Sequence, residues 1–149
     1  NLNIEMPLSA STGKLKLADT TDLTIGTQKN ADKIISGTFT LIADNGFPLD
    51  AGLQIYLLDA AGKISDSLFT AGNIIAAAPV DPGSLKVTSK KRSKLTIPVN
   101  KEKMSKVLGT KKIMITAELT TRPDNKYLKI YISYGIETKL TGDFIYKVY

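Results

Sequence analysis

The sequence predicts an all-β fold, an antiparallel β-sandwich of the immunoglobulin-like or jelly-roll-like kind with at most one short helix. Short runs rich in β-branched and aromatic residues alternate with polar residues, and groups of Gly, Pro, Asp and Asn separate these runs at close spacing. Only one segment has the pattern of a helix. The 149 residues fit one domain at 1–149, and 42% hydrophobic and 23% charged residues are ordinary for a globular protein.

The first half of the chain predicts strands and one hairpin. Residues 2–8 alternate apolar and polar positions, and Pro7, which has no backbone N–H to donate, indicates an edge strand. The β-branched run 34–43 ends at Asp44-Asn45-Gly46, which is a typical turn sequence. Further strands are expected at 14–17, 23–25 and 74–80, and a hairpin at 53–58 and 64–69.

A two-turn helix is predicted after residue 99. Asn100 is a good N-cap, Met104 and Val107 share a helical face with Leu108, and Gly109 suits the position after the last turn. Strands are expected on both sides of this helix, at 94–99 and 111–121.

A long strand is expected at 128–140, and Gly142-Asp143 is expected to separate it from a final strand at 144–148. Because apolar residues recur at every second position in the predicted strands, their inward faces should form the core. The core predicted in this way includes Leu53, Ile113, Ile115, Ile130, Ile132 and Ile136.

Several stretches resemble a known group of domains. The strongest is Asn45 to Asp50 (NGFPLD) followed by Leu53 to Tyr56 (LQIY), and the pattern continues through 58–69. Met6 to Leu8, 18–23 and 112–119 also match. Together these stretches resemble uncharacterised β-sandwich domains of outer-membrane and surface lipoproteins of Bacteroidetes. The resemblance implies a sandwich fold and an extracytoplasmic location, at the cell surface or in the outer membrane or periplasm of a Gram-negative bacterium. It implies no activity.

The composition argues against most enzyme classes. The chain has no histidine and no cysteine, which excludes serine–histidine triads, thiol nucleophiles and most zinc sites. The remaining catalytic candidates are carboxylates, and these fall in or beside predicted turns, where aspartate bonds to the local backbone. We therefore expect no enzyme, no cofactor and no catalytic residue. The aspartates considered are Asp19, Asp22, Asp44, Asp50, Asp59 and Asp66.

Calcium binding is an alternative use of the turns. Asp44-Asn45-Gly46 and Asp124-Asn125 offer the oxygen ligands that calcium takes, but there is no acidic loop of the EF-hand kind. Such oxygens are equally common in plain turns, so the expected metal is none.

The C-terminal tyrosines suggest a ligand face. If Tyr134 points into the core, Tyr131 lies on the opposite face with Lys129, Ser133 and Glu137. Tyrosine offers rigid contact area with a polar tip, so this face could bind sugar or peptide through Tyr131, Lys129 and Glu137. An ordinary exposed sheet accounts for the same residues, since tyrosine has a high strand propensity.

The charge is concentrated in one stretch. Lys86 to Lys112 holds ten basic residues and one acid, Glu102, in a chain of net charge +6. It contains no aromatic residue, so nucleic acid is not an expected partner. We expect a basic loop and a neighbouring helix face that form one positive surface, which contacts anions weakly. The residues predicted to contact anions are Lys90, Lys91, Arg92 and Lys94.

These observations favour a non-catalytic structural or binding module of a bacterial cell-surface or secreted protein. Its partner is expected to be an extracellular protein or glycan. Because the sequence begins at Asn1 with no leader, we expect a piece of a larger protein that contacts a membrane only through an anchor outside it. The alternatives are a carbohydrate-binding accessory domain of a polysaccharide-utilising system and weak anion binding through 86–112.

Overall fold

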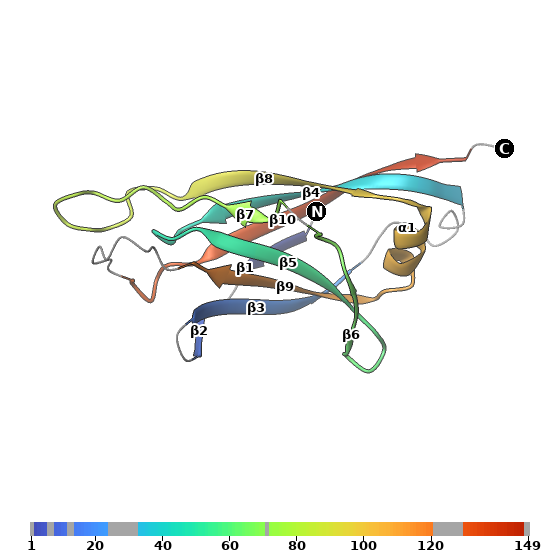
Figure 1. Ribbon diagram of the computed structural model, residues 1–149, viewed down its shortest axis with the longest axis horizontal. Coiled ribbons are helices and arrows are strands. Elements are labelled where there is room, and N and C mark those ends of the chain that lie inside the picture. The colour runs from blue at the N-terminus through green and yellow to red at the C-terminus, as the bar shows by residue number, and fades with distance from the viewer. Residues whose placement is uncertain are drawn as a thin grey trace.

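The computed structural model describes residues 2–5, 8–11, 14–23, 33–70, 72–120 and 130–147. In these residues the chain forms two sheets and one helix (Figure 1). The elements are β1 (Leu2–Glu5), β2 (Leu8–Ser11), β3 (Lys14–Asp22), β4 (Ile34–Asn45), β5 (Ala51–Leu58), β6 (Ile64–Ser67), β7 (Ile74–Ile75), β8 (Lys91–Val99), α1 (Lys101–Leu108), β9 (Lys112–Leu119) and β10 (Ile136–Tyr146).

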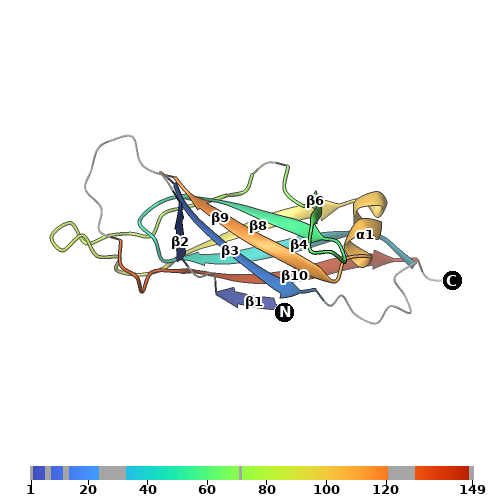
Figure 2. The same cartoon turned by 90° about the horizontal axis from the view of Figure 1, so that it is seen from below.

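The two sheets form the predicted antiparallel sandwich. One sheet has the strand order β1-β10-β4-β8, and the other has the order β2-β3-β9-β5-β6, with β7 also paired to β5. Every pairing is antiparallel. Figures 1 and 2 show the two layers, with β8, β4 and β10 in one and β5, β9 and β3 in the other. Because β9 covers one side of β5, β6 and β7 both lie along its other side.

The core fills the space between the sheets. Strands β4, β5, β8 and β9 alternate buried and more exposed residues, which is the period-2 pattern of a sheet with one buried face. The predicted core positions Leu53, Ile113, Ile115 and Ile136 are confirmed, since each has at most 1% of its surface exposed.

Two predicted core residues are wrong. Ile130 is 37% exposed and Ile132 is 95% exposed. The expected strand at 128–140 starts only at Ile136, because its neighbour β4 ends at Asn45, the residue that pairs with Ile136. Residues 131–134 form a turn instead, closed by the Tyr134 N–H donating to the Tyr131 carbonyl at 3.0 Å. Leu128 lies outside the described residues.

The expected break at Gly142-Asp143 is also wrong, because β10 continues to Tyr146. A Cβ at Gly142 would lie 2.6 Å from the ring of Phe144, and one at Gly37 would lie 2.4 Å from it. The two glycines therefore make room for the Phe144 ring, which packs edge-on against Phe39 with ring centroids 5.5 Å apart. Glycine serves packing here and does not end the strand.

Other predictions differ in their boundaries. The single edge strand expected at 2–8 is two strands, β1 and β2, and each lies at an edge of a different sheet. The strand expected at 14–17 is part of a longer strand, β3, which ends at Asp22. Leu23 is not in a strand, and 24–25 lie outside the described residues. The run 74–80 forms only the short β7. The hairpin of β5 and β6 and the strand at 34–43 are confirmed.

Helix α1 is confirmed and connects the two sheets. The Asn100 side chain accepts from the Lys103 N–H at 2.8 Å, which is the predicted N-cap, and Met104 and Val107 are buried. The helix crosses one end of the sandwich between β8 and β9 (Figure 2). In the described ranges there is no helix with the length and apolar character that a membrane crossing requires.

A buried corner joins the two sheets at the other end of β4. Asn45 is fully buried, and its side-chain amide donates to the carbonyls of Leu49 and Ala76, both at 2.9 Å. Its side-chain oxygen accepts from the Phe47 N–H at 2.9 Å. The amide thereby closes the turn from β4 to β5 and attaches the segment after β7 to it. The stretch 45–50 that carries the family resemblance is therefore a structural corner.

The core assignment predicts opposite results for two isoleucines. Ile115→Ala should lower the free energy of unfolding by about 2–4 kcal/mol, because the side chain is fully buried. Ile132→Ala should change it by less than about 0.5 kcal/mol, because the side chain is exposed to solvent. Urea unfolding of both variants beside the parent protein measures these differences. Equal losses would contradict the placement of residues 130–135.

The corner predicts that Asn45→Ala destabilises the protein by about 2–4 kcal/mol. The substitution removes the side-chain partner of the buried Leu49 carbonyl, the part-buried Ala76 carbonyl and the buried Phe47 N–H. Asn45→Asp should also destabilise, because a carboxylate accepts hydrogen bonds but cannot donate to the carbonyls of Leu49 and Ala76. Thermal unfolding near neutral pH measures both effects, and a stable Asn45→Asp protein would argue against the amide orientation.

Candidate functional site

The basic stretch does not form one patch. Strand β8 has nine residues and is roughly 30 Å long, and it separates the lysines before it from those on and after α1 (Figure 1). The expectation that the basic loop and the helix are neighbours is therefore wrong. It failed because Lys91 to Lys94 belong to β8 itself and do not form a loop that folds back onto the helix.

Two of the four predicted anion contacts are already paired with carboxylates. The Arg92 guanidinium donates to both Asp44 oxygens, at 2.8 and 3.0 Å, and Lys90 pairs with Glu137. The hydrogen bond from Arg92 keeps the pKa of Asp44 below its ordinary value. Lys91 and Lys94 are exposed, and within the described ranges neither makes an ion pair. Anion contact by this group stays a prediction, and these two lysines carry its unneutralised charge.

The predicted tyrosine face is not a strand face, because Tyr131 is the first residue of the turn before β10. The Tyr131 ring packs edge-on against Tyr134 at 5.3 Å, and the Lys86 ammonium lies 5.5 Å from the centre of the Tyr131 ring. Tyr134 in turn contacts Phe47, and its hydroxyl accepts from the Val87 N–H at 2.9 Å. These contacts attach the loop before β8 to the Asn45 corner.

Of the three residues proposed for this face, the structure describes Tyr131 and Glu137. Glu137 lies on β10 and pairs with Lys90, and Lys129 lies outside the described residues. Ligand contact by Tyr131, Lys129 and Glu137 stays a prediction.

The aspartates make structural contacts. Asp59 accepts from the N–H groups of Ala61 and Lys63 at 2.9 Å, and Asp50 accepts from that of Ala77 at 2.8 Å. Asp44 does not lie in a turn as expected, because β4 extends to Asn45. The Asn45 side-chain oxygen accepts from the Phe47 N–H inside the corner. Within the described ranges, no three acidic side chains come close enough to share a metal ion.

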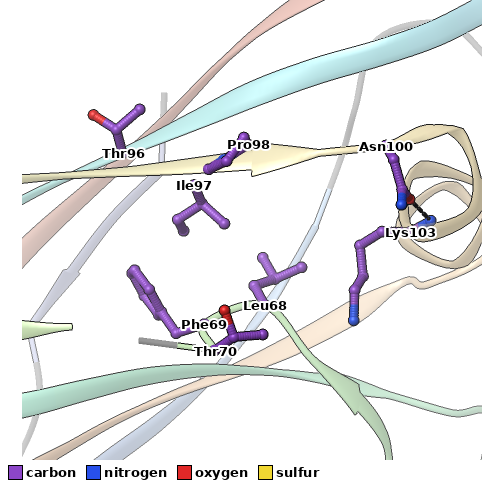
Figure 3. A pocket seen from close by; sticks show the side chains of 8 residues that line it. All are labelled: Leu68, Phe69, Thr70, Thr96, Ile97, Pro98, Asn100 and Lys103. Atoms are coloured by element: carbon purple, nitrogen blue, oxygen red, sulfur yellow. Dashed lines mark hydrogen bonds between the residues drawn. The ribbon is translucent and has the colours of Figure 1, made fainter. Parts of the chain in front are cut away.

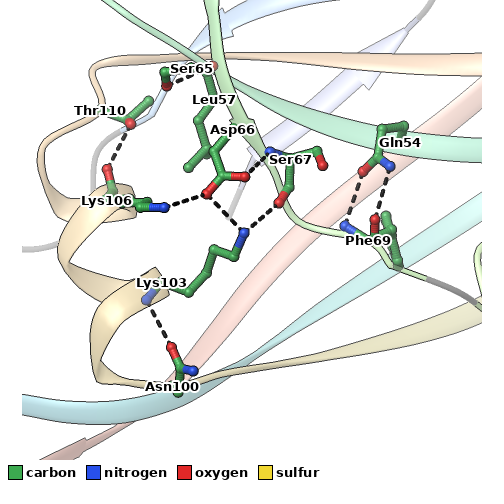
Figure 4. A network of polar contacts seen from close by, with 10 residues as sticks. All are labelled: Gln54, Leu57, Ser65, Asp66, Ser67, Phe69, Asn100, Lys103, Lys106 and Thr110. Atoms are coloured by element: carbon green, nitrogen blue, oxygen red, sulfur yellow. Dashed lines mark hydrogen bonds and ion pairs between the residues drawn. The ribbon is translucent and has the colours of Figure 1, made fainter.

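A polar cluster forms where α1 meets β6 (Figure 4). The Lys103 ammonium donates to an Asp66 oxygen and to the Ser67 carbonyl, both at 2.9 Å, and the Lys106 ammonium lies 3.3 Å from the same Asp66 oxygen. The hydrogen bond from Lys103, followed by that from the Ser67 N–H, lowers the pKa of Asp66 to about 2. One carboxylate thus holds the helix against the edge of the other sheet.

Beside this cluster a cavity opens between the sheets (Figure 3). It has a volume of about 170 Å³ and lies between the end of β8 and the segment after β6. Figure 3 shows Ile97 pointing down toward Leu68 and Phe69, with Lys103 at one side. Apolar and polar side chains therefore both line the cavity. The lining residues are Leu68, Phe69, Thr70, Thr96, Ile97, Pro98, Asn100 and Lys103.

Sequence reasoning missed this site, although one residue signalled it. Pro98 lies inside β8, and proline within a strand indicates an edge, as Pro7 did for the first strand. The residues on the other side of the cavity, Leu68 and Phe69, could not be found in the same way. They come from the opposite sheet, and only the tertiary fold brings them to Ile97.

The polar cluster predicts that Asp66→Asn destabilises the protein by about 1–2 kcal/mol at neutral pH, after allowance for solvent screening. The pKa of Asp66 is lowered by folding, so its stabilisation is present above about pH 4 and is lost as the pH falls toward about 2. The difference between variant and parent in urea unfolding should disappear over that range. Asp143→Asn, which replaces an exposed acid on β10, is the matched control and should change little. A loss that persists at pH 2 would contradict this assignment.

Comparison with known proteins gives distant structural likenesses. No protein-family model and no curated protein matches the chain. A predicted secreted protein from Parabacteroides distasonis ATCC 8503 is similar with 15% identity and a TM-score of 0.47, over 84% of this chain and 36% of that one. The K3 cleaved adhesin domain of Lys-gingipain from Porphyromonas gingivalis W83 is similar with 14% identity and a TM-score of 0.41, over 86% and 63%. The enzymatically active domain of tailspike protein 4 of bacteriophage CBA120 is similar with 14% identity and a TM-score of 0.37, over 96% and 15%. The chain covers less than two thirds of each of these three proteins.

Proposed function

We propose that the chain is a non-catalytic binding module of a secreted or surface-anchored bacterial protein, and that its partner is an extracytoplasmic protein or glycan. The observation that carries this proposal is the state of the carboxylates. Among the described residues, the carboxyls with resolved pKa shifts are Asp44, Asp66 and Asp81, and all three are shifted downward, by hydrogen bonds from Arg92, Lys103 and the Ser84 N–H respectively.

Downward shifts are the opposite of what acid catalysis needs. A carboxylic acid that donates a proton near neutral pH must have its pKa raised, by burial or by a neighbouring negative charge. Asp44 and Asp66 instead face cations, and Asp81 accepts from the Ser84 N–H at 2.7 Å. These groups stay ionised and hold the chain together, which supports a role in binding over one in turnover.

The extracytoplasmic location rests on the resemblance of residues 45–50 and the stretches around them. Those residues form a buried corner that needs no ligand, so the resemblance concerns the architecture of the domain. A module of this kind contributes a binding surface, and the outer edge of β8 has both a cavity and the exposed Lys91 and Lys94 nearby.

The proposal predicts that antibodies against the chain label intact cells of the bacterium that produces it. Labelling should not rise when the cells are permeabilised, whereas a cytoplasmic control protein should be labelled only afterwards. The purified chain should also turn over no chromogenic glycoside or ester. Labelling confined to permeabilised cells would contradict the location, and turnover that Asp44→Asn or Asp66→Asn abolishes would contradict the non-catalytic role.

A further inference from the structure

The outer edge of β8 has free backbone groups. This strand is the last in its sheet and pairs only with β4 in the described part of the chain. In an antiparallel pair, alternate residues direct their N–H and C=O groups to the neighbour, and the residues between them direct theirs away.

Two observations show which residues of β8 direct their backbone groups away from β4. The Gly46 N–H donates to the Gly135 carbonyl at 2.9 Å, so even-numbered residues of β4 bond toward β10 and odd-numbered residues toward β8. These odd-numbered residues pair with the odd-numbered residues of β8. The backbone nitrogen of Pro98, which carries no hydrogen, then lies on the side away from β4, as expected for proline in an edge strand. Arg92, Lys94 and Thr96 therefore direct their N–H and C=O groups outward.

The outward groups are accessible. Arg92, Lys94, Thr96 and Pro98 are all exposed, and no described residue bonds to their backbone. A strand added here could pair from Arg92 to Thr96, and it would end at Pro98 because that residue cannot donate. An exposed edge of this kind is the usual site at which an extended peptide joins a sheet.

The cavity lies where such a strand would place a side chain. Residues directly opposite each other in paired strands point to the same face, so the residue opposite Ile97 would point between the sheets. Ile97 lines the cavity together with Leu68 and Phe69. Its volume of about 170 Å³ is near the roughly 150 Å³ that holds a benzene ring in an apolar protein cavity. A Phe or Leu side chain fits that space.

The charges on β8 indicate what kind of strand would pair with it. The residue opposite Lys94 would lie on the outer face of the sheet, beside an ammonium that has no ion pair among the described residues. Lys91 adds a second exposed ammonium at the start of the strand. Opposite charges across paired strands attract, and like charges repel. A second copy of β8 would bring lysines to lysines, whereas an acidic strand is attracted.

We propose that the outer edge of β8 binds an extended acidic segment of a partner protein by β-strand addition. The segment places an acidic residue opposite Lys94 and one aromatic or branched apolar side chain in the cavity of Leu68, Phe69 and Ile97. This inference rests on the proposed function and names the partner class. Its failure would be distinguishable, because cell-surface labelling and the absence of turnover do not depend on β8.

Hydrogen exchange measured by NMR tests the free edge. In the isolated chain the amides of Lys94 and Thr96 should exchange rapidly, while those of Leu95 and Ile97 should be protected by β4. A short synthetic peptide that alternates Glu with Val, and has one Phe near the end that would lie opposite Ile97, should then protect Lys94 and Thr96. Protection of these two amides without peptide, whether or not it depends on protein concentration, would overturn the proposal, since the edge would already be covered.

Fluorescence polarisation with the same labelled peptide tests the contacts. Lys94→Glu should weaken binding about fivefold. Lys139→Glu is the matched control, because Lys139 pairs with Ile42, which pairs with Lys94, and so lies in the same row but away from the edge. This control should change binding by less than about twofold. Equal losses in both variants would indicate attraction to general charge and would overturn the proposal.

Backbone pairing is tested without altering the protein. A peptide with N-methyl groups on the residues that pair with β8 cannot donate and should bind at least about tenfold more weakly. A peptide of the same composition with its Glu residues in one block should lose affinity similarly, because it has no alternating faces. Equal binding of all three peptides, no binding at millimolar concentration, or heparin binding at Lys94 without amide protection would each overturn strand addition.

Discussion

The side-chain amide of Asn45 lies fully buried where the chain leaves one sheet for the other. An unpartnered amide there would cost several kcal/mol, but both amide hydrogens and the side-chain oxygen have backbone partners, at Leu49, Ala76 and Phe47. The corner fixes where β4 ends and β5 begins, and so it fixes how the two sheets face each other. Gly46 contributes by close approach, since a Cβ there would lie 2.8 Å from the Gly135 carbonyl oxygen.

The consequences of this corner extend along both sheets. Because β4 ends at Asn45, β10 starts at Ile136, and the preceding residues form a turn. That turn brings Tyr134 against Phe47 and toward the Val87 N–H, which positions the loop that leads into β8. The start of β8 is therefore set by the same corner, although Lys91 is 46 residues further along the chain.

The far end of the sandwich is held differently. There Lys103 and Lys106 share the Asp66 carboxylate, which attaches α1 to the edge of the sheet that contains β6. Between the corner and this cluster the outer edge of β8 has no paired strand in the described part of the chain. The cavity beside Ile97 lies at this edge, next to the polar cluster.

The sequence by itself determined the all-β class, the helix at 101–108 and the buried faces of β5, β8 and β9. These follow from local chemistry, namely period-2 alternation, an N-cap and turn residues, which act over a few neighbouring positions. Alternation wrongly predicted that Ile130 and Ile132 are core residues, because a pattern of apolar residues does not show whether a neighbouring strand is present to pair with them.

Only the tertiary structure decided the candidate site. Pro98 signalled an edge strand, but the cavity needs Leu68 and Phe69 from the opposite sheet, about 30 residues earlier in the chain. The charge count predicted one basic surface, but β8 extends between the two groups of basic residues, and Asp44, Asp66 and Glu137 pair with several of them. Pairing across the sandwich depends on long-range contacts, which no local pattern encodes.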